Sequence, residues 1–506
     1  MAEMAEQPRR LDRSRVVSER TSPGGPPRYS DADERFARVP VHVVWELTLA
    51  CDLHCLHCGS RAGRRRPNEL TTAECLEVVD QLAAMGTREV SLIGGEAYLQ
   101  RDLPEIIERI KAHGMYCGIQ SGGRNFTDSR LDAVVAAGLD GLGVSLDGLA
   151  PLHDRLRGAV GSYAAAVSTL QRAADRGLKT SVNTQIGART MPDLMVLLER
   201  LIDLRISHWQ IQLTVAMGNA ADNPEYLLQP YRLRELMPLL LEVYQRCLAH
   251  GIVLEPGNNI GYFGPYEHIW RQPTSGVPHW SGCEAGETSI GLEADGTIKG
   301  CPSLATARYA GGNVRDVSVQ EAWRESTVLR SARADRDQLS GFCRSCYYAE
   351  VCSGGCTWTV DSLFGRPGDN PYCHHRVLEL AEHGLRERVV QRRAASPTSF
   401  GTGHFELILE NLDGSPRRSK PSSEGLGEVD VYAELATPPP ATSPSCSSLL
   451  TCGSCMRFIF PNESVCPFCG SDVETASAEY EAERTLRLAV VEGVLSVLSE
   501  RPANSE

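Results

Sequence analysis

The stretch Leu49 to Gly59, which reads L-A-C-D-L-H-C-L-H-C-G, places Cys51, Cys55 and Cys58 in one short segment. Their C-x3-C-x2-C spacing brings three thiolates together. Three thiolates can hold a [4Fe–4S] cluster at only three of its four irons, so the fourth iron is left open to another ligand. Because a short motif is by itself only a hypothesis, the surrounding sequence has to decide its meaning.

The residues around this motif predict alternating strands and helices. Val41 to Leu47 is a β-branched and aromatic run that predicts a strand, and the cysteines follow in the loop after it. This alternation predicts an α/β fold, a partial (β/α)6 barrel whose cofactor site lies at the carboxyl ends of its parallel strands. The other expected strands are 89–93, 116–120, 141–146, 180–185 and 209–214, and amphipathic helices are expected at 72–85, 103–113, 163–176 and 192–204.

A second motif, Gly94-Gly95-Glu96, follows the second expected strand. The two glycines permit close approach of the backbone to a ligand, and the carboxylate can bind an ammonium group. Together with the three cysteines, this motif resembles the radical SAM superfamily, over roughly residues 40 to 260. The resemblance implies an enzyme whose open iron chelates S-adenosylmethionine and cleaves it reductively to methionine and a 5′-deoxyadenosyl radical.

The same resemblance suggests which residues contact S-adenosylmethionine. Glu96 would meet the methionyl ammonium, and Arg157 would bind the methionyl carboxylate bidentately, with Arg155 as a competitor. His57 would lie against the adenine, unless it is an ordinary surface histidine. Small polar residues suited to the ribose hydroxyls, which could equally serve as turn or capping residues, are Ser121, Ser145, Asp147 and Asn183.

A second cysteine-rich region resembles the SPASM extension of radical SAM peptide maturases. Its cysteines spell C-x12-G-x4-C, a gap, C-x2-C-x5-C-x3-C, another gap and a final C. Thiolates this dense in a chain without a signal peptide are expected to bind metal rather than to form disulfides, and zinc is the alternative to iron–sulfur. The resemblance implies one auxiliary [4Fe–4S] cluster on Cys343, Cys346, Cys352 and Cys373, and a second on Cys283, Cys301 and Cys356.

That second auxiliary cluster departs from the pattern of sulfatase-maturing relatives, which supply a further cysteine soon after the first. No cysteine occurs here between Cys283 and Cys301. The fourth iron is therefore either open to substrate or bound by another ligand, and the sequence does not choose between them.

The C-terminal part carries a third metal motif, C-x2-C-x10-C-x2-C, formed by Cys452, Cys455, Cys466 and Cys469. This spacing resembles a zinc ribbon or a rubredoxin-like pair of knuckles, and zinc is favoured because such small ribbons are usually structural. Cys446 has no evident partner. A Pro- and Ser-rich segment precedes the ribbon. We therefore expect the ribbon to be an independent module that could recruit the substrate or a partner, with packing against the core as the alternative.

The composition divides the chain into six expected parts. They are a disordered segment at 1–39, the radical SAM core at 40–260, the SPASM domain at 261–392, a linker at 393–445, the ribbon at 446–475 and an amphipathic helix at 476–506. Within the linker, His404 to Leu412 is a short apolar stretch that could form a strand. No apolar run is long enough to span a membrane, and the absence of a signal-peptide core predicts a cytoplasmic protein.

The closer resemblance rests on the runs Val44 to Ala62, Gln210 to Gly218, Gly257 to Tyr266 and Asn370 to His375. Through them residues 40 to 390 resemble most closely the radical SAM/SPASM maturases associated with short peptides of a Y-x10-GDL pattern, which implies a ribosomally made precursor peptide as the expected substrate. The expected reaction is abstraction of hydrogen from this peptide, which gives an oxidised residue or a crosslink, with flavodoxin or ferredoxin as electron donor. The net charge of −13 argues against binding of duplex nucleic acid. The alternatives are a tetrapyrrole-type small-molecule enzyme and a non-catalytic, cluster-bearing peptide-binding scaffold.

Overall fold

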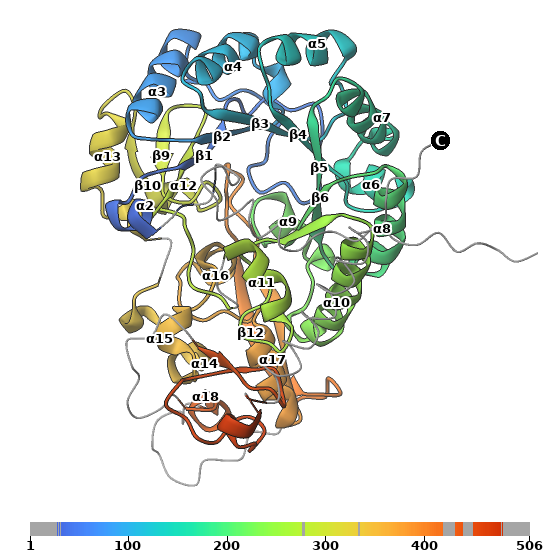
Figure 1. The fold of residues 1–506 in the computed structure, drawn as a ribbon, viewed down its shortest axis with the longest axis vertical. Helices are drawn as coiled ribbons and strands as arrows, with labels where there is room; N and C mark the ends of the chain where they lie inside the picture. The colour runs from blue at the N-terminus through green and yellow to red at the C-terminus, as the bar shows by residue number, and fades with distance from the viewer. Residues whose placement is uncertain are drawn as a thin grey trace, which may run out of the picture.

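The computed structural model describes residues 28, 30, 32–275, 279–331, 334–417, 431–438, 449–476 and 478 (Figure 1). Its largest element is a ten-stranded sheet in the order β10-β9-β8-β1-β2-β3-β4-β5-β6-β7. The strands of the barrel half, each parallel to its neighbours, are β1 (His42–Glu46), β2 (Glu89–Ile93), β3 (Tyr116–Ser121), β4 (Gly141–Ser145), β5 (Lys179–Ile186), β6 (His208–Leu213) and β7 (Val253–Pro256).

Amphipathic helices cover the outer face of this sheet, as Figure 1 shows for α3, α4, α5, α7 and α8. Helix α3 begins with a capping box, in which Thr71 and Glu74 satisfy each other's backbone N–H groups. The parallel sheet and its layer of helices confirm the predicted α/β partial barrel. The helices of this half are α3 (Thr72–Ala84), α4 (Leu103–Ala112), α5 (Asp128–Ala136), α6 (Ala150–Arg157), α7 (Ser162–Asp175), α8 (Leu194–Asp203), α9 (Asn219–Asp222) and α10 (Leu233–Ala249).

The cysteine-rich extension shares the sheet of the barrel. Strand β8 (Ser289–Leu292) pairs in parallel with β1, so that Trp45 lies opposite Leu292, and it continues antiparallel into β9 (Thr297–Lys299) and β10 (Ala310–Asn313). The remaining helices of the extension are α11 (Glu267–Ser275), α12 (Thr306–Tyr309), α13 (Val319–Glu325), α14 (Gly341–Ser345), α15 (Ala349–Cys352), α16 (Thr357–Phe364) and α17 (His374–Glu382).

The start of the expected linker contains one strand of a long hairpin, in the apolar stretch that could form a strand, whereas the other strand lies in the segment expected to be the SPASM domain. Strand β11 (Leu385–Arg393) pairs antiparallel with β12 (His404–Asn411), and Glu410 of β12 forms an ion pair of 2.8 Å with Arg386 of β11. The linker therefore begins later than expected, because the apolar stretch around Phe405 joins the core. The loop joining the two strands bonds to the barrel through the amide of Gly218, which donates to Gly401 O at 2.8 Å.

The N-terminal and C-terminal parts also depart from the expected boundaries. Helix α2 (Ala32–Ala37) lies inside the segment for which we expected disorder, and its Glu34 forms an ion pair of 2.9 Å with Arg88. The expected C-terminal helix lies almost wholly outside the described residues, as does Cys446. Among the described residues, no helix combines the length and the apolar composition that crossing a bilayer requires.

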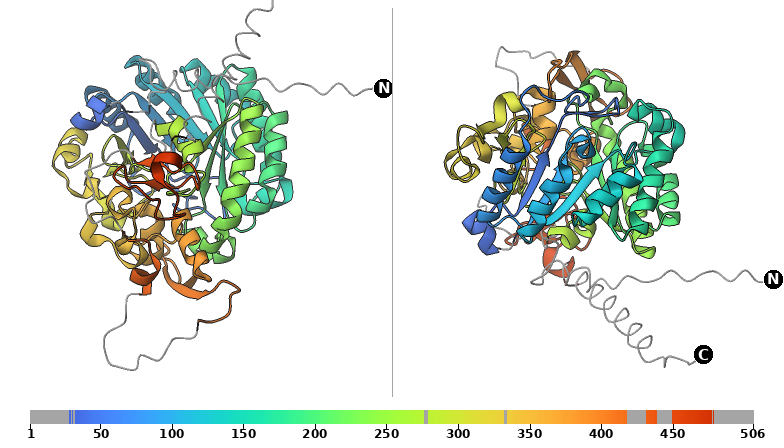
Figure 2. Two further views of the ribbon diagram at one scale, coloured as in Figure 1. Left: turned by 60° about the horizontal axis from the view of Figure 1, so that its bottom comes forward. Right: turned by 90° about the horizontal axis from the view of Figure 1, so that it is seen from above.

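The C-terminal ribbon is not the independent module that we expected. It contains β13 (Leu450–Thr451) and β14 (Phe458–Ile459), and it packs with α18 (Val431–Leu435) against the SPASM part (Figure 2). Phe458 and Phe460 of the ribbon are fully buried in one apolar cluster with Tyr347 and Tyr348 of the SPASM part. The expectation was wrong because the proline-rich segment suggested separation, whereas the ribbon has too small a core of its own to bury these rings.

Candidate functional site

The three cysteines of the first motif lie in the loop after β1, at the carboxyl end of the strand. Backbone hydrogen bonds hold this loop in place: Cys51 N donates to Gly63 O at 3.1 Å, and Leu56 N donates to Leu156 O at 2.8 Å. The amides of Leu53 and Ala62 point at Cys51 Sγ and Cys58 Sγ, at 3.4 Å each. Amide donors of this kind stabilise thiolates, which are the form that binds iron.

Gly94 and Gly95 allow β2 to approach the cysteine loop closely. Gly95 N donates to Thr48 O and Glu96 N donates to Ala50 O, each at 2.8 Å. A Cβ atom on Gly95 would stand 2.6 Å from the carbonyl carbon of Ala50, closer than real Cβ contacts come. The expected reason for the two glycines was approach to a ligand, whereas here they meet the backbone that leads into Cys51.

Glu96 lies at the centre of a small hydrogen-bonded group beneath the cysteine loop. Its carboxylate accepts hydrogen bonds from Ser121 Oγ and from Gly122 N, both at 2.6 Å. Burial raises the pKa of the Glu96 carboxyl to about 7, although these two hydrogen bonds oppose the rise. Ser121, which we expected near the ribose, thus positions Glu96 in this structure.

Arg157 and His57 meet at the buried carboxylate of Asp147, which follows β4. Arg157 Nη2 lies 2.5 Å from Asp147 Oδ2, and His57 Nε2 lies 3.3 Å from the same oxygen. Burial raises the pKa of Asp147, but the charges of Arg157 and His57 outweigh it and hold that pKa well below its usual range. Arg157 Nη1 also approaches Cys55 Sγ at 3.8 Å, while Arg155 is exposed to solvent.

Two further residues expected near the ribose lie on neighbouring strands. Ser145 on β4 is paired in register with Asn183 on β5, and the Asn183 amide donates to Gln120 Oε1 on β3.

The buried Arg157 Nε has no hydrogen-bond partner among the described residues. A carboxylate on a bound ligand would satisfy this orphaned donor, so Arg157 fits the role expected of it better than Arg155 does.

The cysteines of the SPASM part gather in two groups. Burial raises the pKa of the Cys283 thiol, and the nearby thiols of Cys301 and Cys356 raise it further. Burial likewise raises the pKa of Cys352, with further contributions from Cys373, Cys343 and Cys346. Crowded thiols of this kind fit a cationic cluster, which would neutralise their thiolate charges.

The segment from 257 to 266 runs between the two groups. Tyr262, which is fully buried, accepts a hydrogen bond on its hydroxyl from Cys356 N at 3.1 Å, while its carbonyl lies 3.7 Å from Cys373 Sγ. The side-chain amide of Asn258 lies 3.6 Å from Cys283 Sγ. A single residue, Tyr262, therefore contacts one group through its side chain and the other through its backbone, which neither cysteine spacing nor periodicity could predict.

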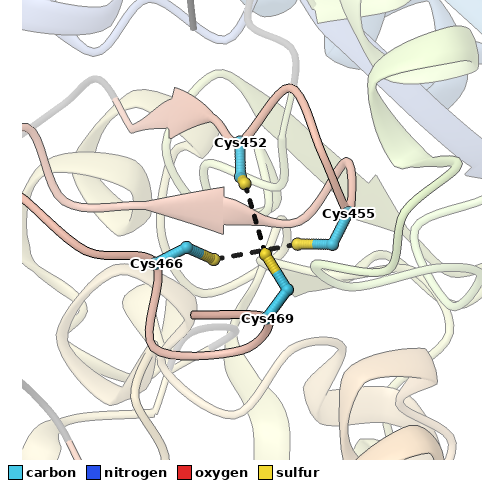
Figure 3. Close-up of side chains that lie close together, drawn as sticks. All are labelled: Cys452, Cys455, Cys466 and Cys469. Carbon is cyan, nitrogen blue, oxygen red and sulfur yellow. Dashed lines mark hydrogen bonds between the residues drawn. The ribbon is translucent and has the colours of Figure 1, made fainter. Parts of the chain in front are cut away.

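The four ribbon cysteines form a compact tetrahedral group (Figure 3). Cys452 Sγ and Cys469 Sγ lie 3.7 Å apart, and Cys455 Sγ and Cys466 Sγ lie 3.8 Å apart. Zinc–sulfur bonds of about 2.3 Å in a tetrahedron place the sulfurs about 3.8 Å apart. Among the described cysteines only these four lie within 4.8 Å of one another as a group, which fits one ion rather than a multi-iron cluster.

A cavity of about 260 Å³ lies between the first cysteine loop and the SPASM part. His57 and Gly94 line it on one side, and Pro302 and Trp358, close in sequence to Cys301 and Cys356, line it on the other. Other lining residues that sequence reasoning missed are Glu46, Gln185, Met217, Glu293 and Phe400. They come from strands and loops far apart in the chain, and no local pattern marks them.

Two family models match parts of this chain. Residues 45–201 match the radical SAM superfamily, and residues 283–347 match the SPASM iron–sulfur cluster-binding domain. The chain is a radical SAM/SPASM protein. The first match contains Cys51, Cys55 and Cys58, and the second contains four of the seven SPASM cysteines. The chain therefore is an enzyme of this family, with iron–sulfur clusters and S-adenosylmethionine as cofactors.

Curated relatives match this radical SAM/SPASM protein over most of their own length. PqqA peptide cyclase of Ruegeria pomeroyi is 28% identical over 70% of this chain and 94% of its own. Mycofactocin maturase MftC of Mycobacterium ulcerans is 28% identical over 73% of this chain and 98% of its own. Pre-heme d1 synthase of Dinoroseobacter shibae is 27% identical over 70% of this chain and 91% of its own.

A solved structure shares the fold at lower identity. Native anSMEcpe with bound AdoMet superposes with a TM-score of 0.53 at 16% identity, covering 66% of this chain and 94% of the other. At this identity the likeness shows the fold alone. It supports the radical SAM arrangement of the sheet and its extension.

Proposed function

We propose that this chain is a peptide maturase that abstracts hydrogen from a ribosomally made precursor peptide and leaves an oxidised residue or a crosslink. The bound cofactor would supply the 5′-deoxyadenosyl radical at the loop of Cys51, Cys55 and Cys58. Glu96 would bind the methionyl ammonium and Arg157 the carboxylate. We further propose three [4Fe–4S] clusters, and flavodoxin or ferredoxin as the external electron donor.

The cavity between the two cysteine regions is the observation that carries this proposal. Its walls belong to the cofactor-binding side through His57 and Gly94, and to the auxiliary side through Pro302 and Trp358. A substrate group placed there would contact the radical source and lie next to the site that can accept the second electron. This arrangement suits oxidation by two electrons, which a radical source alone cannot complete.

Two of the named relatives favour a peptide over a tetrapyrrole as the substrate. The names of two relatives, a PqqA peptide cyclase and a mycofactocin maturase, agree with a peptide substrate.

The test uses the holoenzyme with S-adenosylmethionine, a chemical reductant and a synthetic peptide of the Y-x10-GDL pattern. We expect 5′-deoxyadenosine and a peptide that has lost hydrogen in equal amounts. Phe400→Ala, which enlarges the cavity, should change peptide modification while leaving peptide-independent cleavage unaltered. Phe36→Ala is the matched control, because Phe36 is 93% exposed. Turnover of a tetrapyrrole with no change in any peptide would establish the alternative function.

A further inference from the structure

The ribbon and the auxiliary-cluster region are built around one shared apolar core. We call it the ribbon–SPASM core; it contains Tyr262, Phe263, Trp280, Phe342, Tyr347 and Tyr348 from the SPASM side and Leu449, Phe458 and Phe460 from the ribbon side. Cys346, Cys356 and Cys373, which are candidate cluster ligands, belong to the same core. The ribbon thus packs directly against the region that would hold the auxiliary clusters.

Hydrogen bonds fasten the ribbon to the two tyrosines that follow Cys346. Tyr348 Oη donates to Phe458 O at 2.5 Å, and Phe460 N donates to Tyr347 Oη at 2.9 Å. Both tyrosines are almost wholly buried. Because a buried hydroxyl that loses its partner costs free energy, each of these bonds ties the position of the ribbon to the position of the Cys343–Cys346 turn.

A buried ion pair fastens the ribbon to the helix that starts at the last cluster cysteine. Arg457 Nη1 lies 2.8 Å from Glu379 Oε1, and both side chains are less than a tenth exposed. Glu379 belongs to α17, which begins directly after Cys373. Breaking a buried pair by removing one partner is strongly destabilising, because the remaining charge is left without compensation.

One aromatic ring links the ribbon cysteines to the cluster cysteines. Phe468 stands between Cys466 and Cys469, and its ring centroid lies 5.5 Å from that of His375 and 5.9 Å from that of Tyr348. Neither ring nitrogen of the buried His375, two residues after Cys373, has a hydrogen-bond partner among the described residues. A shift of the ribbon cysteines would therefore move Phe468 against Tyr348 and His375, which are close in sequence to Cys346 and Cys373, and the reverse also holds.

The ribbon cannot maintain its shape by its own packing. Apart from two cysteines, its separate core contains only Ile459, Val473 and Ala476 as buried residues, and its two strands are two residues long each. Segments below about 40 residues usually need a metal, a disulfide or a partner surface to fold. Here a metal ion and the SPASM surface both supply that support.

We propose that a zinc ion bound by Cys452, Cys455, Cys466 and Cys469 is thermodynamically coupled to the auxiliary cluster at Cys343, Cys346, Cys352 and Cys373. Zinc orders the ribbon, and the ordered ribbon closes the ribbon–SPASM core over the cluster cysteines. The coupling is reciprocal, so the cluster must raise zinc affinity by the same factor as zinc raises cluster affinity. This role goes beyond the proposed maturase activity and does not depend on the identity of the substrate.

The experiment measures zinc and iron release from the same anaerobic holoenzyme. Elemental analysis should first give one zinc per chain. A zinc chelator is then added, and we expect the zinc-free protein to lose half its iron at a concentration of iron chelator roughly 5- to 150-fold lower than the zinc-bound protein does, the usual range of affinity change for coupled sites. In the reverse direction, Cys343→Ala/Cys346→Ala protein should bind zinc more weakly by a similar factor.

Two ribbon variants separate coupling from metal binding itself. Phe468→Ala removes the linking ring and no thiolate, so zinc should still bind while its effect on iron release falls. Val465→Ala is the matched control, because Val465 precedes Cys466 and is 55% exposed. Unchanged iron release after full zinc removal would overturn the proposal, as would equal effects of the two variants. Iron in place of zinc at this site would overturn the metal assignment.

Discussion

Replacement of Gly95 by alanine leaves every cysteine in place, but it should disrupt the cluster site at Cys51, Cys55 and Cys58. A Cβ atom at this position would stand 2.7 Å from Leu49 O and 2.6 Å from the carbonyl carbon of Ala50. Ordinary contacts begin at 3.4 Å, so the Leu49 carbonyl would have to withdraw by roughly 0.7 Å and the Ala50 carbonyl, whose oxygen is the nearest atom, by more than that. These atoms are backbone, and they lead directly into Cys51.

The size of this shift determines the expected result. Metal sites tolerate deviations of only about ±0.2 Å in ligand distance, and a misplacement of about 1 Å at a reacting centre costs on the order of 100-fold in rate. Overpacking of this kind also costs about 1–3 kcal/mol in stability. We therefore expect Gly95→Ala to lose one cluster's worth of iron and at least about 100-fold in 5′-deoxyadenosine formation.

The assay combines iron content with 5′-deoxyadenosine formation in anaerobic protein. Gly63→Ala is the matched control, because Gly63 pairs with the same loop and a Cβ atom there meets nothing within 4 Å. This control should keep its iron and its cleavage activity. Normal iron content and cleavage in Gly95→Ala would show that the close approach of β2 to the cysteine loop does not position the cluster.

Three further predictions concern the cofactor. Changing Cys51, Cys55 and Cys58 together to alanine should remove one cluster's worth of iron and abolish 5′-deoxyadenosine formation while leaving the SPASM clusters, and retained cleavage would contradict the assignment. Glu96→Gln and Arg157→Ala should each weaken S-adenosylmethionine binding by about ten- to a hundredfold without loss of iron, as equilibrium binding can measure. Because the raised pKa of about 7 leaves the Glu96 carboxyl protonated below neutral pH, affinity for the methionyl ammonium should rise as pH increases through 7, and Glu96→Gln should abolish this dependence.

The raised pKa of Glu96 also affects the stability of the fold. Its contribution to stability falls as the pH rises, whereas the affinity for S-adenosylmethionine should increase. In the unfolded chain the Glu96 carboxyl ionises near its ordinary value of 4.5, whereas in the folded chain it holds its proton to about 7. Between these two values the unfolded state binds fewer protons than the folded state. The contribution of Glu96 to stability is therefore full below about pH 4.5 and is lost as the pH rises to 7.

Local patterns in the sequence were enough for the barrel. The six strands expected from the sequence are all present as β1 to β6, because β-branched and aromatic residues are enriched in strands, and buried residues alternate along strands such as β3 and β6. Local spacing likewise indicated that Cys51, Cys55 and Cys58 belong together, and that the ribbon cysteines form two C-x2-C pairs. The two SPASM groups followed from the family resemblance instead, since Cys352 and Cys356 are only four residues apart and are assigned to different groups.

Contacts between distant segments were beyond the reach of such patterns. The cavity joins β1, β8, the segment after β6 and the loop of the β11–β12 hairpin, where Phe400 lies far along the chain from Glu46. The same limit explains the error about the ribbon. A proline-rich segment shows that the chain leaves the core, but it does not show where the chain returns.

By itself, the sequence determined the radical SAM and SPASM resemblance, the barrel, and the grouping of the first three cysteines and of the two ribbon pairs, since each depends on residues that are neighbours in the chain or repeat with a fixed period. Only the tertiary structure decided that Gly95 meets the backbone before Cys51, that Arg157 rather than Arg155 faces the cluster loop, and that the ribbon closes over Tyr347 and Tyr348. These features arise from packing between segments far apart in the chain. Their complementarity is a property of the folded surfaces, which no local pattern of residues encodes.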